Sequence, residues 1–165
     1  MAINFLEILN HLHDSHIDFV IVGGVAAALH GSSRVTFDLD IVPSMAPDSW
    51  SAIVELLWSL GARPRIPEPV ERIRDVEQVR RWQDEKGMLA LNFRTPDGST
   101  EVDLLVSESN RLDALRQRAV TVVVDGRRFF VASIDDLVAM KQQAGRPQDL
   151  LDIAQLQDIK KRAEG

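Results

Sequence analysis

The sequence contains no cysteine among its 165 residues and only four histidines. The missing cysteines exclude a disulfide framework and a thiolate metal site. His11, His13 and His16 lie near the N-terminus and His30 stands alone, a distribution that disfavours a zinc centre. Ions that are bound by oxygen atoms, such as Mg²⁺, remain compatible with this composition.

The sequence also lacks a long apolar run and an excess of basic residues. No segment of roughly eighteen apolar residues occurs, so we expect no membrane span. The N-terminal stretch has neither the basic region nor the apolar core of a signal peptide, which predicts a cytoplasmic protein. The formal net charge of −6 argues against general coating of nucleic acid.

The spacing of apolar residues predicts an α+β fold, with a mixed, largely antiparallel sheet flanked by helices. Helices are predicted over residues 3–14, 25–31, 47–61, 70–87, 110–119, 133–145 and 147–165. Strands are predicted over residues 18–24, 34–42, 88–95, 99–107, 120–124 and 127–132, with a loop at 62–69 and a type I′ turn at Asp125-Gly126. The strands at 88–95 and 99–107 flank the turn sequence PDG and are predicted to form a hairpin, and Ser133 is the predicted N-cap of the helix at 133–145. The length predicts a single domain over residues 1–165, in which an α+β core (1–132) precedes a helical part (133–165).

The strand predicted over residues 34–42 carries two carboxylates in D-x-D spacing. Because side chains alternate along a strand, Asp38 and Asp40 leave the same face. A solvated strand face would explain this pair. However, the stretch TEVDLLV alternates in the same way and carries Glu101 and Asp103 on one face. If the two strands are neighbours, Asp103 or Glu101 completes a set of three carboxylates that two Mg²⁺ ions can share.

Two glycines follow the first predicted strand. Gly23 and Gly24 would allow a phosphate to approach the backbone N–H groups before a helix, although a tight turn without a ligand explains them equally well. Ser32 and Ser33 could donate hydroxyl groups to a phosphate or be ordinary loop residues. Arg34 could pair with the acids that follow it or reach a triphosphate.

The stretch VGGVAAALHGSSRVTFDLDIV resembles the start of a nucleotidyltransferase of the DNA polymerase β superfamily, and among these is most similar to the AbiE-type (type IV) toxin nucleotidyltransferases and their relatives. The resemblance covers about residues 18–42, 100–106 and 138–156, and it implies the mixed sheet of that superfamily with C-terminal helices. It further implies that three aspartates are both catalytic residues and metal ligands, namely Asp38, Asp40 and Asp103. The nucleotide-binding residues that it implies are Gly23, Gly24, Ser32, Ser33, Arg34 and Lys141. The second glycine replaces a serine of many relatives, so one hydroxyl group for the triphosphate is lost.

The stretch MKQQAGRPQDLLDIAQL extends the resemblance, which implies that the Lys141 ammonium binds the nucleotide phosphates. A lysine late in a helix is also stabilised by the helix dipole alone. Asp149 and Asp152 are three residues apart on a predicted helix and therefore share a face, from which they could hold Lys141 or Arg146 in place.

Basic residues concentrate in residues 61–82. The six arginines of this arginine cluster are Arg63, Arg65, Arg72, Arg74, Arg80 and Arg81. Together with Trp82 they could follow an RNA backbone and stack a base. Alternatively, they form ion pairs on the exposed face of a helix.

These features predict an enzyme, a Mg²⁺-dependent nucleotidyltransferase that moves a nucleoside monophosphate from an NTP to a hydroxyl acceptor. The acceptor would be an RNA (tRNA) 3′ end or a protein, and the chain would be the toxin of a toxin–antitoxin system with a cognate antitoxin as partner. One alternative is a non-catalytic antitoxin-like or regulatory module with the same fold. Another is an aminoglycoside-type adenylyltransferase, which needs an acidic surface to bind its acceptor.

Overall fold

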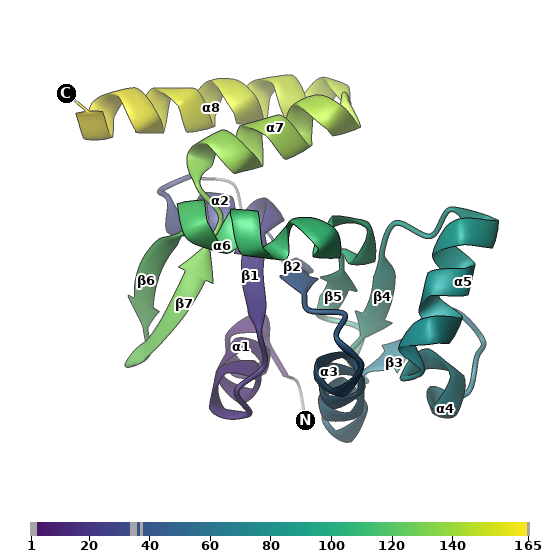
Figure 1. Cartoon of the computed structure of the whole chain (residues 1–165). Coiled ribbons are helices and arrows are strands. Elements are labelled where there is room, and N and C mark those ends of the chain that lie inside the picture. Colours follow the sequence, from purple (N-terminus) through teal and green to yellow (C-terminus); the bar gives the residue numbers. More distant parts are fainter. Residues whose placement is uncertain (1–2, 34–35, 37, 165) are drawn as a thin grey trace.

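The computed structural model describes residues 3–33, 36 and 38–164, which form one mixed sheet surrounded by helices (Figure 1). The strands are β1 (Phe19–Val22), β2 (Asp38–Pro43), β3 (Arg63–Pro64), β4 (Leu91–Arg94), β5 (Glu101–Leu104), β6 (Val120–Val124) and β7 (Arg127–Val131). Their order in the sheet is β3-β4-β5-β2-β1-β7-β6. Only β1 with β7 and β2 with β5 run parallel among these neighbours; the others are antiparallel. The predicted α+β class with a largely antiparallel sheet is confirmed.

The helices pack against one another as well as against the sheet. They are α1 (Phe5–Asp14), α2 (Gly23–Leu29), α3 (Pro47–Ser59), α4 (Val70–Ile73), α5 (Val76–Lys86), the 3₁₀ helix η1 (Val106–Arg111), α6 (Leu112–Arg118), α7 (Ile134–Ala144) and α8 (Pro147–Glu164). Helix α3 contacts α1, α4 and α5, whereas α7 contacts α2 and α8. In Figure 1, α7 and α8 lie at one end of the sheet and α1 and α3 lie at the other end.

Local sequence explains where the central elements begin. All four residues of β1 are buried, as their apolar side chains require in a strand with neighbours on both edges. Helix α1 begins after Asn4, whose side chain accepts a hydrogen bond from the Glu7 backbone N–H at 2.9 Å. Helix α7 begins in the same way after Ser133, which accepts from the Asp136 N–H at 3.1 Å. The predicted serine cap is therefore confirmed.

The β6–β7 hairpin closes with the turn that its sequence predicts. Asp125 and Gly126 have φ values of 53° and 74°, and two consecutive positive φ values are the mark of a type I′ turn. This hairpin places β7 beside β1, so that α7 leaves the sheet next to its central strands.

Several element boundaries differ from the prediction. The helix predicted over residues 70–87 is divided into α4 and α5, because the Asp75 side chain accepts from the Glu77 N–H and starts a new helix. The predicted loop at 62–69 contains the short edge strand β3. Strand β2 begins at Asp38, and residues 34, 35 and 37 of the predicted strand lie outside the described residues.

Among the described residues, no helix combines the length and the hydrophobicity that a membrane span requires.

Candidate active site

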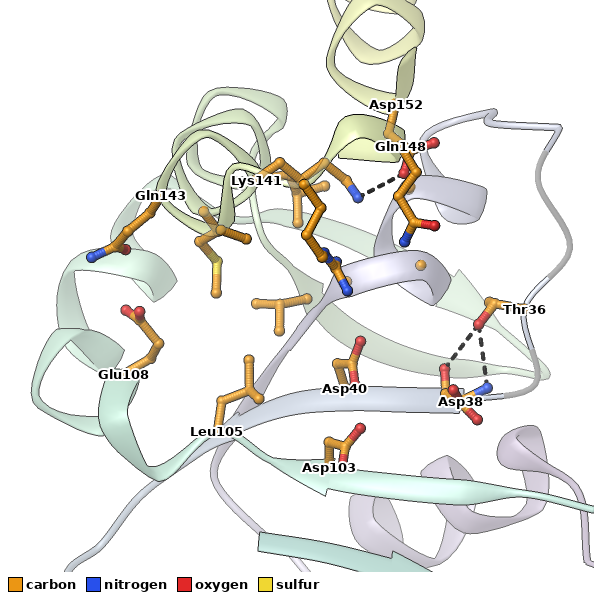
Figure 2. A pocket seen from close by; sticks show the side chains of 18 of the residues that line it. Thr36, Asp38, Asp40, Asp103, Leu105, Glu108, Lys141, Gln143, Gln148 and Asp152 are labelled. Atoms are coloured by element: carbon orange, nitrogen blue, oxygen red, sulfur yellow. Dashed lines mark hydrogen bonds and ion pairs between the residues drawn. The ribbon is translucent and has the colours of Figure 1, made fainter. Parts of the chain in front are cut away.

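The three aspartates selected from the sequence lie side by side on two neighbouring strands. Strands β2 and β5 are parallel, and their register pairs Asp40 with Asp103 and Asp38 with Glu101. Leu39 and Ile41 point to the opposite face of β2 and are fully buried. Figure 2 shows Asp38, Asp40 and Asp103 pointing into the same cleft. The predicted set of three carboxylates required these two strands to be neighbours. The structure meets this condition.

The close approach of these carboxylates changes their acidity. Burial and the neighbouring Asp103 raise the pKa of Asp40 to about 7, and the positive charge of Lys141 opposes this shift. The pKa of Asp38 is also raised, mainly by burial and then by the charges of Glu101 and Asp103. In the protein without a bound cation, a proton retained on Asp40 therefore reduces the negative charge of the cleft.

Gly23 makes room for the aspartates. It is the first residue of α2 and has a φ of +67°, a conformation that residues with a Cβ atom rarely adopt. A Cβ atom at this position would lie 2.1 Å from Oδ2 of Asp40 and 2.8 Å from its Cβ. At Gly24, a Cβ atom would lie 3.0 Å from the Cβ of Thr36, just before β2. The Gly-Gly pair therefore lets the start of α2 pack directly against the D-x-D strand.

The two serines of the following loop are tied to the C-terminal helix. Ser32 donates its hydroxyl hydrogen to Oε1 of Gln155 in α8 at 3.1 Å, and the Gln155 amide donates to Oγ of Ser33 at 3.0 Å. Ser32 lines the cleft, whereas Ser33 is not among the described residues that line it. Arg34, the third nucleotide-binding candidate in this loop, lies outside the described residues.

Lys141 enters the cleft from α7 and is held there by two aspartates of α8. Its Nζ atom lies 3.1 Å from Oδ2 of Asp152 and 3.7 Å from Oδ1 of Asp149. Asp149 is almost fully buried and also accepts two hydrogen bonds from the Arg146 guanidinium, at 3.0 and 3.2 Å. This pairing lowers the pKa of Asp149, so the carboxylate stays charged. The prediction that Asp149 and Asp152 hold Lys141 and Arg146 is confirmed.

The three aspartates, the glycine turn, Ser32 and Lys141 border one cleft of about 1060 Å³ between the sheet and helices α7 and α8. One half contains the three aspartates, the glycine turn and Lys141. The other half is lined by Leu105, Glu108 and Gln143, as Figure 2 shows, and Met140 also borders it. Sequence reasoning missed this second half, because its residues come from η1 and α7 and share no strand or helix pattern.

The structure also identifies a polar neighbour that the sequence analysis missed. Asn92 on β4 lies opposite Asp103 and donates a hydrogen bond from Nδ2 to Oδ1 of Asp103 at 2.6 Å. The predicted hairpin of residues 88–107 contained a signal for this contact, since its register determines which residue faces Asp103.

The arginine cluster forms contacts within the protein. Arg65 pairs with Glu101, Arg72 with Glu68, Arg74 with Glu55 and Arg80 with Glu77, while Arg81 donates to Gln78 and Arg63 stacks on Trp58. Two of these contacts, Arg72 with Glu68 and Arg80 with Glu77, have the i,i+4 and i,i+3 spacing of the predicted ion-paired alternative. The prediction that Trp82 stacks a base is wrong, because this side chain is 4% exposed and packs into the core.

The donor atoms near Asp40 fit a hard cation. Carboxylate oxygens are the ligands that Mg²⁺ prefers, and a cation here would offset the repulsion that raises the pKa values of Asp38 and Asp40. Among the described residues, no group of three or more His, Asp or Glu side chains is already gathered around a common point as a finished metal site.

Comparisons with known proteins agree on one type of fold. Over residues 2–162, the chain matches the family described as a nucleotidyltransferase of unknown function (DUF6036). No curated protein matches the chain. Its structure is similar to that of the lincosamide antibiotic adenylyltransferase LnuA with lincomycin bound, with a TM-score of 0.58 and 12% identity over 94% of this chain and 95% of that chain.

Two further solved structures share this fold. The antibiotic-resistance factor ANT(2'')-Ia has a TM-score of 0.55 and 14% identity, over 98% of this chain and 82% of that chain. An antigenic nucleotidyltransferase-like protein from Paracoccidioides brasiliensis has a TM-score of 0.53 and 20% identity, over 90% of this chain and 71% of that chain.

The raised pKa of Asp40 predicts how the stability of the apo protein depends on pH. The folded protein keeps a proton on Asp40 up to a pH of about 7, whereas the unfolded chain releases it near the ordinary aspartate pKa of 3.8. The contribution of Asp40 to the free energy of unfolding should therefore decrease by about 3 kcal/mol as the pH rises from 4 to 7. Asp40→Asn should remove most of this decrease and unfold at a higher urea concentration at pH 8. An Asp40→Asn variant that is less stable than the wild type at pH 8 would contradict this account.

The close packing of Gly23 predicts a second effect. Gly23→Ala should displace the Asp40 side chain and weaken the binding of Mn²⁺ in the presence of ATP by about 10-fold or more, measured by calorimetry. Gly87→Ala is a matched control, because Gly87 has a φ of +65° and no atom within 4 Å of an added Cβ. Both variants bear the same backbone strain, of about 1 kcal/mol, but only Gly23→Ala should lose metal affinity. Equal affinities in the two variants would show that the collision with Asp40 does not matter.

Proposed function

The chain belongs to this family of nucleotidyltransferases, and we propose that it uses the cleft beside α7 and α8 to transfer a nucleoside monophosphate from an NTP to a hydroxyl group. One observation carries the proposal: the register that pairs Asp40 with Asp103 on parallel strands, with Asp38 on the same face. Gly23, which makes room for Asp40, and Lys141 border the same cleft.

The three aspartates are the proposed ligands of two Mg²⁺ ions. Asp38 and Asp40 would contact both ions and Asp103 would contact one. When bound, Mg²⁺ would neutralise charge on the triphosphate and favour in-line attack on its α-phosphorus. In the absence of an ion, the raised pKa of Asp40, about 7, leaves this carboxyl group partly protonated near neutral pH. Binding of Mg²⁺ should therefore release protons.

The proposed reaction is a single displacement. The acceptor oxygen forms a bond to the α-phosphorus, the bond from this phosphorus to the oxygen bridging to the β-phosphate breaks, and pyrophosphate leaves. Asp103 is the proposed acceptor of the hydroxyl proton, because its carboxylate faces the cleft beside Asp40.

The phosphates are proposed to rest between the glycine turn and α7. The backbone N–H groups of Gly23 and Gly24 and the hydroxyl groups of Ser32 and Ser33 would donate hydrogen bonds, and Arg34 is a further candidate in this loop. Lys141 would bind the phosphates by exchanging its ion pair with Asp152 for one with the triphosphate. The C-terminal helices would then respond directly to the presence of nucleotide.

The acceptor is proposed from two lines of argument. The similarity to AbiE-type toxins favours an RNA 3′ end or a protein, with an antitoxin as partner. A small hydroxylated molecule is the second candidate, and one observation favours it: Glu108 adds a further acid to the cleft, while the arginine cluster is bound to acids, amides and a tryptophan. The solved structures of similar fold include two proteins named for antibiotics, which agrees with a small acceptor.

Transfer of label tests the function. The protein should be incubated with each α-³²P-labelled NTP, Mg²⁺ and separate fractions of cellular RNA, protein and small molecules. We expect label in one acceptor fraction and release of pyrophosphate, and a loss of about 100-fold or more in rate for Asp103→Asn. Asp113→Asn is the control, because Asp113 has a 92% exposed side chain outside the cleft. Equal rates in the two variants would exclude Asp103 from the chemistry.

A second experiment separates the acceptor classes. The combined replacement of Arg72, Arg74, Arg80 and Arg81 by Ala should leave the transfer rate unchanged, because these side chains are engaged within the protein. An RNA acceptor held by these arginines would give a different result. Its affinity would fall, and the slope of log affinity against log salt would become shallower by about one unit for each phosphate that the variant no longer binds.

A further inference from the structure

Asn92 is the polar residue nearest to the proposed catalytic centre that the reaction described above does not use. It lies on β4, the strand next to β5, and the register places it directly opposite Asp103. Its Nδ2 atom donates to Oδ1 of Asp103 at 2.6 Å, a short bond of the kind that carboxylates form. Asp40, Asp103 and Asn92 therefore form one row across three neighbouring strands.

The hydrogen bond orients the Asp103 carboxylate. One oxygen of Asp103 accepts the hydrogen bond from Asn92, and the register places Asp103 beside Asp40 on the neighbouring strand. Rotation of the Asp103 carboxylate would break the bond to Asn92. The carboxylate is therefore held in one orientation beside Asp40, and less of its motion has to be restricted when a ligand arrives.

The carbonyl oxygen of the Asn92 side chain shows that an asparagine at this position also destabilises the folded protein. Oδ1 of Asn92 is buried and has no hydrogen-bond partner among the described residues. A buried carbonyl group without a partner destabilises the folded state, because it has given up its hydrogen bonds to water. Rotating the amide by half a turn would bring this oxygen against the Asp103 carboxylate. A leucine, which has nearly the same shape, would remove the unpaired carbonyl group but also the bond to Asp103, so the reason for an asparagine at this position is the bond to Asp103.

We propose that Asn92 is a positioning residue that holds the Asp103 carboxylate in the orientation needed to bind a divalent cation. This inference rests on the proposed function of the cleft. It assigns Asn92 no contact with the nucleotide or the acceptor, since it acts only through Asp103.

Asn92→Leu tests the proposal, with Mn²⁺ as the probe. The free Mn²⁺ signal in electron paramagnetic resonance should be titrated with and without ATP. We expect the variant to bind Mn²⁺ about 10- to 100-fold more weakly, the range typical for loss of a group that orients a metal ligand. The melting temperature of the apo variant should stay close to the wild-type value, because the loss of the bond to Asp103 is offset by removal of the unsatisfied carbonyl group.

The chain offers a matched control. Asn10 also donates from Nδ2 to an aspartate, to Oδ2 of Asp125 at 2.9 Å, and its Oδ1 atom is also buried without a partner. Asp125 lies in the β6–β7 turn, away from the cleft. Asn10→Leu should therefore leave the Mn²⁺ affinity within about 2-fold of wild type. Asn92→Ser, which shortens the side chain and loses the bond, provides a second variant if Asn92→Leu does not fold.

Asp103→Asn separates the two levels of the proposal. Loss of Mn²⁺ affinity in Asp103→Asn and in the Asn92 variants, but not in Asn10→Leu, would support the positioning role. Wild-type affinity in the Asn92 variants together with loss in Asp103→Asn would overturn the role of Asn92 and leave the proposed site intact. Wild-type affinity in all of them would overturn the proposed metal site as well.

Discussion

Repulsion between carboxylates on β2 and β5 is the constraint around which the rest of this cleft is arranged. The register brings Asp40 and Asp103 together on parallel strands, where burial and their mutual charge raise the pKa of Asp40 to about 7. Such a pair is costly in a protein without a ligand. Its neighbours reduce the cost in different ways: Asn92 donates a hydrogen bond to Asp103, and Lys141 supplies positive charge. Neither Asn92 nor Lys141 removes the repulsion between the two carboxylates. The remaining negative charge of the site favours binding of a cation.

The same electrostatic balance connects the sheet to the C-terminal helices. Lys141 of α7 opposes the raised pKa of Asp40 while its ammonium group is held by Asp149 and Asp152 of α8. Gln155 of the same helix holds the serines that follow α2. A triphosphate in the proposed position would compete with Asp152 for Lys141 and with Gln155 for the serine hydroxyl groups. Helix α8 therefore contributes to the site without lying on the sheet. Nucleotide binding should change the contacts that Asp152 and Gln155 of this helix make.

The sequence was sufficient to predict the acids but not their surroundings. Strict alternation around Leu39 and Ile41 determines the face of Asp38 and Asp40, because a strand with one buried face allows a single orientation. The hairpin around residues 95–100 was predictable from its turn residues. Pairing of β2 with β5 was only a condition, since the two strands are parallel and separated by α3, α4, α5 and β4. The contact from Asn92 to Asp103 depends on this pairing and on the hairpin register, and Glu108 comes from a 3₁₀ helix that has no periodic signal.

Three departures from ordinary folding preferences lie on or beside this row of residues. Gly23 adopts a positive φ, Asp40 is a half-buried acid with a raised pKa, and Asn92 buries a carbonyl group without a partner. Elsewhere, the positive φ of Asp125 is explained by its type I′ turn. Natural sequences tolerate such local conflicts where function requires them. Because Gly23, Asp40 and Asn92 come from α2, β2 and β4, no single local cause accounts for all three. What they share is contact with the Asp40–Asp103 pair, and a divalent cation bound between these two carboxylates would offset the largest of the three costs.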